Sequence, residues 1–242
     1  MPGGTRNSQH ISANVTQTRL GPALFAIVAA ASAGYLLART HYSPIPGVEH
    51  RYTRQLILRY TFSRVDDPII VLGDSITEAA TLPASACGHT IVNAGLNGAS
   101  TASDLGNWLK LPLAGKRAFA IIVSLGINDA ITATSVDRQA FAERYAALLG
   151  ELSKLTTRLF IVEIPPVETH EWLPADRQKV IMATIREYRS VLLEVATQTH
   201  ATLLALPEVP SPSTIDGVHL NAEGYRAWDQ TVMQGASQAC GQ

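Results

Sequence analysis

The sequence predicts an α/β domain in which helices cover both faces of a parallel sheet, a three-layer α/β/α sandwich. Two observations predict it: five short apolar runs recur between residues 66 and 242, and longer segments with helical periodicity separate them. Continuous apolar runs are typical of strands buried on both faces, and alternation of strand with helix is typical of parallel sheets. The length of 242 residues suits one such domain with a short N-terminal appendage.

Each apolar run predicts one strand. The runs end in turn-forming or helix-breaking residues, among them Gly73, Pro165 and Pro207. Parallel strands need a crossover connection, and each interval is long enough to supply one. We therefore expect a five-stranded parallel sheet, with strands in residues 68–72, 90–92, 118–123, 159–164 and 202–206.

Helices are expected in residues 136–155, 175–199 and 221–238, with a further helix beginning near Ile76. In each of the first two, apolar side chains recur every three or four residues, which places them on one face. Ser135 and Asp137 are candidate caps for the first. The apolar stripe of that helix comprises Phe141, Tyr145, Leu148, Leu149 and Leu152.

The N-terminal region contains an uncharged apolar run over residues 20–38, between Arg19 and Arg39. As a helix it would span about 28 Å, close to the ~30 Å core of a bilayer. No Asp or Glu precedes Glu49, which is typical of an export signal. Three interpretations remain open: a membrane anchor, a signal cleaved after Ala33, and a buried soluble helix. Arg39, Arg51 and Arg54 follow the run, so the positive charges do not fix the orientation of an anchor. We favour a domain outside the cytoplasm because the acid-free N-terminus is typical of an export signal.

This pattern predicts a short cytoplasmic segment (1–19), the anchor or signal (20–38), a linker (39–65) and the α/β domain (66–242). Proline and glycine at positions 44, 46 and 47 interrupt helical continuation in the linker. Residues 52–60 favour a short amphipathic helix, lying either near the membrane or against the domain.

Composition excludes several classes of protein. Lys and Arg number 19 against 20 Asp and Glu, a balance that argues against nucleic-acid binding. Two cysteines exclude a zinc site built mainly from thiolates, and the seven histidines show no pair at metal-ligand spacing near a carboxylate cluster. No metal or cofactor is expected. Cys87 and Cys240 could form one disulfide if the domain is exported, but the sequence does not supply their separation, so whether they pair is left open.

Polar residues that could carry chemistry follow the apolar runs, at the sheet edge where parallel α/β proteins bind ligands. Ser75 follows the first run at the start of a helix, where N–H groups favour negative charge. Gly95 ends the second, Asn128 follows the third, and Asp216 and His219 follow the fifth. Singly, each has an ordinary structural explanation such as a helix cap or a turn. Together they follow four different runs in one order.

The segments GDSIT (73–77), NAG (93–95), GIND (126–129) and DGVHL (216–220) resemble the SGNH, or GDSL-type, hydrolases. The resemblance covers about residues 67–240 and implies a flavodoxin-like fold and ester hydrolysis without a cofactor. It implies that Ser75 is the nucleophile, His219 the general base and Asp216 the residue that orients it. The oxyanion hole would comprise the backbone N–H groups of Ser75 and Gly95 and the Asn128 side chain. Ile76 replaces the usual Leu, another apolar residue.

Further residues are candidates for lining the cleft. Asn97 and Ser100 follow Gly95, and His170 and Trp172 lie in a loop that either contacts substrate or only packs. Asp74 is a further substrate-binding candidate, although a hydrogen bond to the loop backbone is the simpler expectation for it and for Asp129.

The leading functional hypothesis is an esterase for small acyl groups, such as O-acetyl groups on envelope or extracellular carbohydrate. The alternatives are a lipid-directed hydrolase (a lysophospholipase or thioesterase), an acyltransferase, and a non-catalytic binding module. The expected partners are an ester of a small molecule, glycan or lipid and, through residues 20–38, a membrane. Oligomeric state is not predicted.

Overall fold

The computed structural model describes residues 48–241. The expected segments 1–19 and 20–38, and the first part of the linker, lie outside the described residues. Within 48–241, every helix is too short or too polar to cross a bilayer. The anchor or signal therefore stays a prediction.

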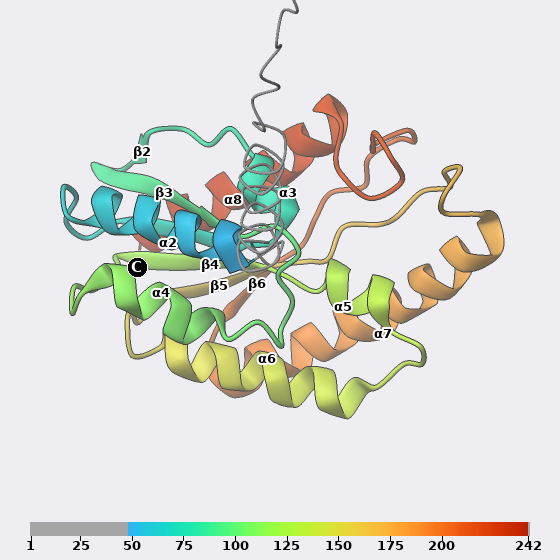
Figure 1. Ribbon diagram of the computed structural model, residues 1–242, viewed down its shortest axis with the longest axis horizontal. Coiled ribbons are helices and arrows are strands. Elements are labelled where there is room, and N and C mark those ends of the chain that lie inside the picture. The colour runs from blue at the N-terminus through green and yellow to red at the C-terminus, as the bar shows by residue number, and fades with distance from the viewer. Residues whose placement is uncertain (1–47, 242) are drawn as a thin grey trace, which may run out of the picture. The chain divides into compact units, whose positions relative to one another are not determined.

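Six strands form one sheet in the order β2-β3-β1-β4-β5-β6 (Figure 1). All neighbouring strands are parallel except β2 and β3, which are antiparallel. The five predicted strands are present, but the sequence misses β2, whose two residues are too few for a period-two pattern. The strands are β1 (Ile69–Gly73), β2 (Ser85–Ala86), β3 (His89–Gly95), β4 (Ala120–Ser124), β5 (Leu159–Val162) and β6 (Thr202–Leu204).

Helices cover both faces of this sheet (Figure 1), which confirms the three-layer α/β fold. The predicted helix 175–199 has those bounds in the structure, and the other two predicted helices differ by one to three residues at each end. The helices are α2 (Val48–Phe62), α3 (Ser75–Ala79), α4 (Leu105–Leu113), α5 (Ile127–Thr132), α6 (Arg138–Leu152), α7 (Ala175–Thr199) and α8 (Ala222–Cys240).

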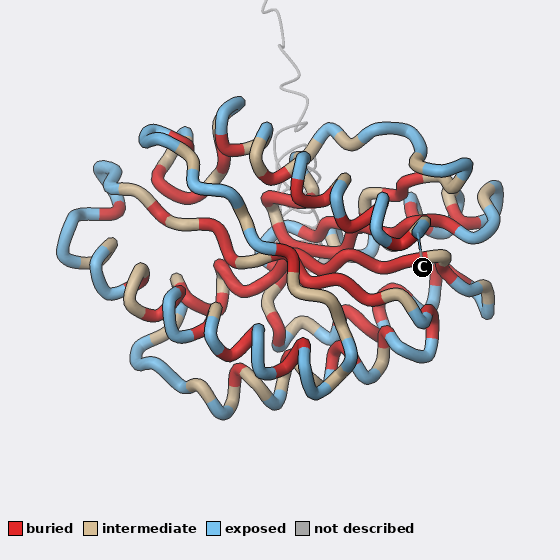
Figure 2. The backbone as a smooth tube through the Cα atoms, turned by 180° about the vertical axis from the view of Figure 1, so that it is seen from behind, coloured by how far each residue is buried: buried red, intermediate tan, exposed pale blue. Residues whose placement is uncertain are grey.

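The core lies on both sides of the central strands (Figure 2). Every residue of β1, β4 and β5 is buried, as expected for strands covered on both faces. The predicted apolar stripe of α6 is also buried. In the register, Gly73 at the end of β1 is level with Gly95 of β3 and Ser124 of β4. The loops that leave these three strands therefore begin side by side.

Helix α2 extends beyond the predicted residues 52–60, and it lies against the domain rather than apart from it. It packs on α4, with Leu58 and Phe62 buried. The Trp108 indole donates to the Arg51 carbonyl oxygen and Gln55 donates to the Trp108 carbonyl oxygen. Helix α2 thus belongs to the same compact unit as the sheet.

Cys87 and Cys240 form a disulfide, with 6.4 Å between their Cα atoms. Cys87 lies in the turn between β2 and β3, and Cys240 is the last residue of α8. The bond ties the edge of the sheet to the C-terminal helix, at the amino end of β3 and away from the carboxyl edge of the sheet.

Candidate active site

Ser75 lies where β1 passes directly into α3. Gly73 ends the strand in space that only glycine fits, because a Cβ there would lie 2.0 Å from the Thr77 hydroxyl oxygen. Asp74 caps the helix, its Oδ1 accepting from the Ile76 N–H at 2.9 Å. Ser75 is half-buried at the first position of the helix, where backbone N–H groups have no partner within the helix. Its N–H and hydroxyl are therefore available at the carboxyl edge of the sheet.

Ser75, His219 and Asp216 lie in hydrogen-bonding contact. The Ser75 Oγ is 3.0 Å from the His219 Nε2, and the His219 Nδ1 is 2.6 Å from the Asp216 Oδ2. The other carboxylate oxygen of Asp216 accepts from the backbone N–H groups of Val218 and His219. With Nδ1 protonated, the neutral imidazole donates to the carboxylate and leaves Nε2 free to accept the serine proton.

Two carboxylates near the serine have opposite pKa shifts. Burial would raise the pKa of Asp216, but hydrogen bonds from the His219 side chain and from two backbone N–H groups outweigh it and lower the pKa. Asp74 is fully enclosed, and burial raises its pKa to about 7. Asp216 is therefore ionised across the neutral range, as a partner for an imidazolium must be.

The 213–220 loop, which contains Asp216 and His219, is held by Glu168. The Glu168 carboxylate accepts from the backbone N–H and the hydroxyl of both Ser213 and Thr214. In return, the Glu168 N–H donates to the Gly217 carbonyl oxygen at 2.8 Å. No sequence motif singles out Glu168, because its partners are backbone N–H groups and ordinary hydroxyls 45 and 46 residues away.

Trp172 and His170, the two candidate substrate contacts in the loop after β5, make different contacts. The Trp172 indole donates to the Asp216 carbonyl oxygen at 2.9 Å, although half of its side chain is exposed. His170 is exposed, and its backbone pairs with Leu173. Trp172 therefore borders the 213–220 loop through a hydrogen bond, whereas His170 borders it only by packing, since a Cβ at Gly217 would lie 3.1 Å from the His170 Cβ.

Gly95 does not supply the free backbone N–H that its predicted role in the oxyanion hole requires. Its N–H donates to the Asn93 Oδ1 at 2.9 Å, and a Cβ at this position would lie 2.1 Å from the Glu78 nitrogen. Gly95 is therefore needed for close packing of β3 on α3, and its N–H is already engaged.

Gly98, three residues further on, has the free N–H group that the prediction required. Its φ of 73° favours glycine, and its N–H has no hydrogen-bond partner among residues 48–241. Asn97 on one side donates its N–H to the Glu78 Oε2, and Ala99 on the other accepts from the Asn128 Nδ2 at 2.8 Å. The Asn128 amide keeps a second N–H for a ligand.

The remaining candidates are structural or exposed. Asp74 is buried and caps α3, so the prediction that it binds substrate is wrong. Asp129 accepts from the Thr101 N–H and hydroxyl and so braces the loop after β3, as expected. The Asn97 side chain is exposed on that loop, whereas Ser100 is half-buried and pairs with Ser103. Residues 48–241 contain no cluster of three or more His, Cys, Asp or Glu side chains that could hold a metal ion.

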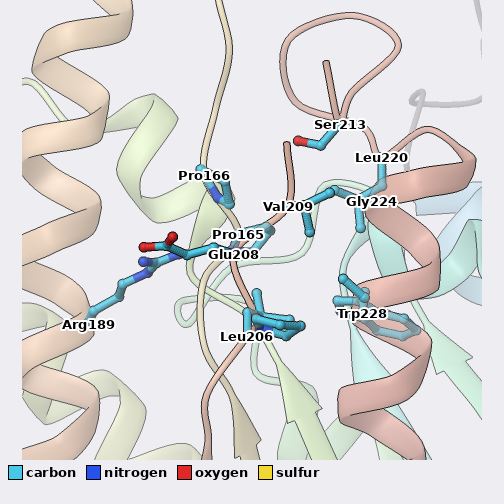
Figure 3. Close-up of a pocket in the computed structure, with 12 residues that line it drawn as sticks. Pro165, Pro166, Arg189, Leu206, Glu208, Val209, Ser213, Leu220, Gly224 and Trp228 are labelled. Carbon is cyan, nitrogen blue, oxygen red and sulfur yellow. The ribbon is translucent and has the colours of Figure 1, made fainter. Parts of the chain in front are cut away.

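A cavity of about 290 Å³ lies beside the 213–220 loop, beyond the ends of β5 and β6 (Figure 3). Ser213 and Leu220 line it from the loop, and Trp228 lines it from α8. Ser75, Asp216 and His219 are not among its lining residues, so it is separate from the serine site. Its wall also includes Pro165, Pro166, Arg189, Leu206, Pro207 and Val209.

A serine, an imidazole and a carboxylate linked in this order, at the carboxyl edge of a parallel sheet, are the arrangement found in serine hydrolases. The model of the GDSL-like lipase/acylhydrolase family matches residues 71–227. The chain therefore belongs to this family, whose membership implies hydrolysis of esters. No curated protein sequence matches the chain.

Solved structures share the fold at low sequence identity. A Streptococcus pneumonia protein assigned as a platelet activating factor has a TM-score of 0.64 at 23% identity, covering 84% of this chain and 98% of its own. A GDSL-like lipase from Bacteroides thetaiotaomicron has a TM-score of 0.56 at 16% identity, covering 76% and 98%. A catalytic mutant of an acetylxylan esterase from Geobacillus stearothermophilus has a TM-score of 0.55 at 16% identity, covering 70% and 94%.

Proposed function

We propose that this protein is a serine esterase that removes small acyl groups, such as acetyl, from carbohydrate outside the cytoplasm. The hydrogen-bonded series Ser75–His219–Asp216 carries the proposal, with 3.0 Å and 2.6 Å between the bonded atoms. A neutral hydroxyl is a poor nucleophile unless an adjacent base takes its proton, and His219 is placed to do so.

In the acylation step, the Ser75 Oγ attacks the ester carbonyl carbon and its proton passes to the His219 Nε2. Negative charge moves to the carbonyl oxygen, which accepts hydrogen bonds from the N–H groups of Ser75 and Gly98 and from the Asn128 amide. Collapse of this intermediate breaks the bond to the alcohol, which leaves with the proton from His219. Water then attacks the acyl-serine by the same route and releases the acid.

Asp216 keeps the imidazole in the productive tautomer and stabilises its charged form. The lowered pKa of Asp216 supports this role, since a neutral carboxyl group would not stabilise an imidazolium. Each oxyanion donor contributes about 2.7–4 kcal/mol to lowering the barrier in comparable enzymes.

The carbohydrate substrate and the exported location rest on separate observations. The acetylxylan esterase shares the fold, which makes acetylated sugar a reasonable first substrate class. The Cys87–Cys240 disulfide supports an oxidising compartment. The apolar run 20–38 supports export or membrane attachment, and attachment would also suit the second candidate, a lipid-directed hydrolase.

Hydrolysis of 4-nitrophenyl acetate, butyrate and octanoate by the full-length protein tests the proposal. Ser75→Ala should lower kcat by about 10⁴-fold or more, because it removes the nucleophile. Ser135→Ala, an exposed serine without a hydrogen-bond partner among residues 48–241, should match the wild type. A preference for acetate supports the small-acyl esterase, and a rate that rises with chain length favours the lipid-directed hydrolase. Activity no higher than that of Ser75→Ala on these esters and on acetylated sugars would reject ester hydrolysis and favour a transferase or binding module.

A further inference from the structure

Helix α2 reaches the proposed oxyanion loop through Arg54. The Arg54 Nε donates to the Gly95 carbonyl oxygen at 3.1 Å, and its Nη2 donates to the Asn93 carbonyl oxygen at 3.2 Å. These carbonyls belong to the last three residues of β3, on the edge that faces away from β1. Strand β2 pairs only with His89 and Thr90, so the guanidinium satisfies carbonyls that no strand covers.

Glu78 extends this contact to the loop after β3. Its Oε1 lies 3.6 Å from the Arg54 Nε, and its Oε2 accepts from the Asn97 N–H at 2.6 Å. His50, also on α2, lies 3.0 Å from the same carboxylate. The side chains of Arg54 and Glu78 are only 16% and 20% exposed, so water screens this pair less than it screens a surface ion pair. Glu78 is also one turn beyond Ser75 on α3.

These contacts hold the residues that lead into Gly98. The neighbouring Asn97 N–H is fixed by Glu78, and the chain that leads into the loop is fixed by Arg54 at Asn93 and Gly95. Among residues 48–241 the Gly98 N–H has no hydrogen-bond partner, and a Cβ there would meet nothing within 4 Å. Beyond Gly98 the loop is held from α5, by Asn128 at Ala99 and by Asp129 at Thr101, and the Ala99 N–H closes a turn onto the Leu96 carbonyl oxygen. Before Gly98 it is held by Arg54 on α2 and Glu78 on α3.

We propose that Arg54 is a positioning residue for the oxyanion hole, acting with Glu78 to hold the loop that presents the Gly98 N–H. This inference rests on the proposed esterase function. Helix α2 precedes the family match at residues 71–227, so the family pattern does not assign this role. Arg54 touches neither the ester nor the triad, and its effect is transmitted through Glu78 and the backbone.

The test compares Arg54→Met with Arg59→Met in the full-length protein, using 4-nitrophenyl acetate. Arg59 is exposed on the same helix and its side chain contacts neither Glu78 nor β3. Because a small misplacement of a catalytic group is costly, kcat should fall about tenfold in Arg54→Met, with KM changed less than about twofold. Arg54→Lys should recover part of the rate, since it keeps the charge beside Glu78 but loses the fork that spans two carbonyls.

A double-mutant cycle separates this role from simple destabilisation. Because Arg54 and Glu78 hold the same loop, the double variant Arg54→Met/Glu78→Ala should lose clearly less kcat than the product of the two single losses. Losses that multiply fully would overturn the inference that the two residues act together. Thermal unfolding of each variant identifies any that fail to fold, and Arg54→Lys then serves for the comparison.

Amide hydrogen exchange of residues 96–99 gives a readout that does not depend on esterase activity. The Asn97 amide should exchange at least about tenfold faster in Arg54→Met than in Arg59→Met, because the acceptor that protects it is released. Equal exchange, or a kcat equal to that of Arg59→Met, would overturn the inference. If the wild type has no esterase activity but the Asn97 amide still exchanges faster in Arg54→Met than in Arg59→Met, the proposed function is rejected and the link between Arg54 and the loop is kept.

Discussion

Asp74 and Asp216 both lie near His219 but in different surroundings. Asp216 is half-buried and accepts three hydrogen bonds, which lower its pKa. Asp74 is fully enclosed and accepts one hydrogen bond, from the Ile76 N–H, so burial dominates and its pKa rises to about 7. At a pH between the two pKa values, Asp216 is therefore ionised while Asp74 still binds a proton.

The raised pKa of Asp74 makes stability fall as pH rises. Its folded pKa of about 7 exceeds the ordinary aspartate value of 3.8, so its stabilising contribution is complete below about pH 4 and is lost as pH rises to about 7. At about 1.4 kcal/mol for each pH unit, the total is on the order of 4 kcal/mol. Asp74→Asn keeps an oxygen for the Ile76 N–H but does not ionise. We therefore expect it to raise the free energy of unfolding at pH 8 relative to the wild type.

Urea unfolding at pH 4.5 and pH 8 measures this difference. Asp176→Asn, at an exposed position in the first turn of α7, is the control and should shift stability equally at both pH values. A difference between wild type and Asp74→Asn that does not change with pH would contradict the assigned protonation of Asp74.

The sequence predicted those site residues that directly follow strands. Ser75, Asn128, Asp216 and His219 each come after an apolar run, and parallel strands bring such positions to one edge. The choice between Gly95 and Gly98 could not be predicted, because it depends on the Asn93 side chain occupying the Gly95 N–H. Glu168 was missed for a related reason. Its carboxylate accepts hydrogen bonds mainly from backbone N–H groups, and a backbone N–H leaves no signature in the sequence.

At the scale of elements, length and periodicity decided what could be predicted. Helix α7 has 25 residues with a repeating apolar face, and its bounds followed from that pattern. Strand β2 has two residues and no pattern to detect. Helix α2 was predicted only over its central residues, because its contacts with α4 and β3 are made partly by polar groups, Gln55 and Arg54, that periodicity ignores.

Helix α8 begins three residues after His219, so its N-terminal cap also bears on the site. The Asn221 Oδ1 accepts from the Glu223 and Gly224 N–H groups, and its Nδ2 donates to the Pro212 carbonyl oxygen. Asn221→Ala should lower the free energy of unfolding by about 1–2 kcal/mol. It should also lower kcat, because the 213–220 loop loses its attachment to the helix.

Asp137→Ala is the matched control for this prediction. Asp137 caps α6 by accepting from the Ala140 N–H, far along the chain from the proposed triad. Both variants should lose similar stability in urea unfolding, but only Asn221→Ala should lose activity. Equal kcat values in the two variants would show that the cap stabilises the fold without positioning His219.

At the scale of the whole molecule, the aligned strand ends create the site. Because β1, β3 and β4 end level with one another, Ser75, the loop after β3 and Asn128 leave the sheet together. His219 joins them from the loop before α8. The predicted topology already implied this convergence. The contacts that Arg54 and Glu78 make with the loop after β3 could not be predicted, because they join side chains that only the folded chain brings together.

The disulfide stabilises this arrangement from the other edge of the sheet. Cys87 and Cys240 are 153 residues apart in sequence, a loop whose closure corresponds to about 5 kcal/mol in a chain-entropy treatment, and loss of native disulfides typically costs about 2–5 kcal/mol. Cys87→Ser/Cys240→Ser should therefore lower the free energy of unfolding by about that amount, measured by urea denaturation. The folded variant should keep its kcat, because the bond lies at the amino end of β3 and Ser75 lies beyond the carboxyl end of the neighbouring strand. Reductant should destabilise the wild type to the level of the variant and leave the variant unchanged. If reductant alters neither protein, the bond contributes nothing to stability, and the support it lends to an exported location is lost with it.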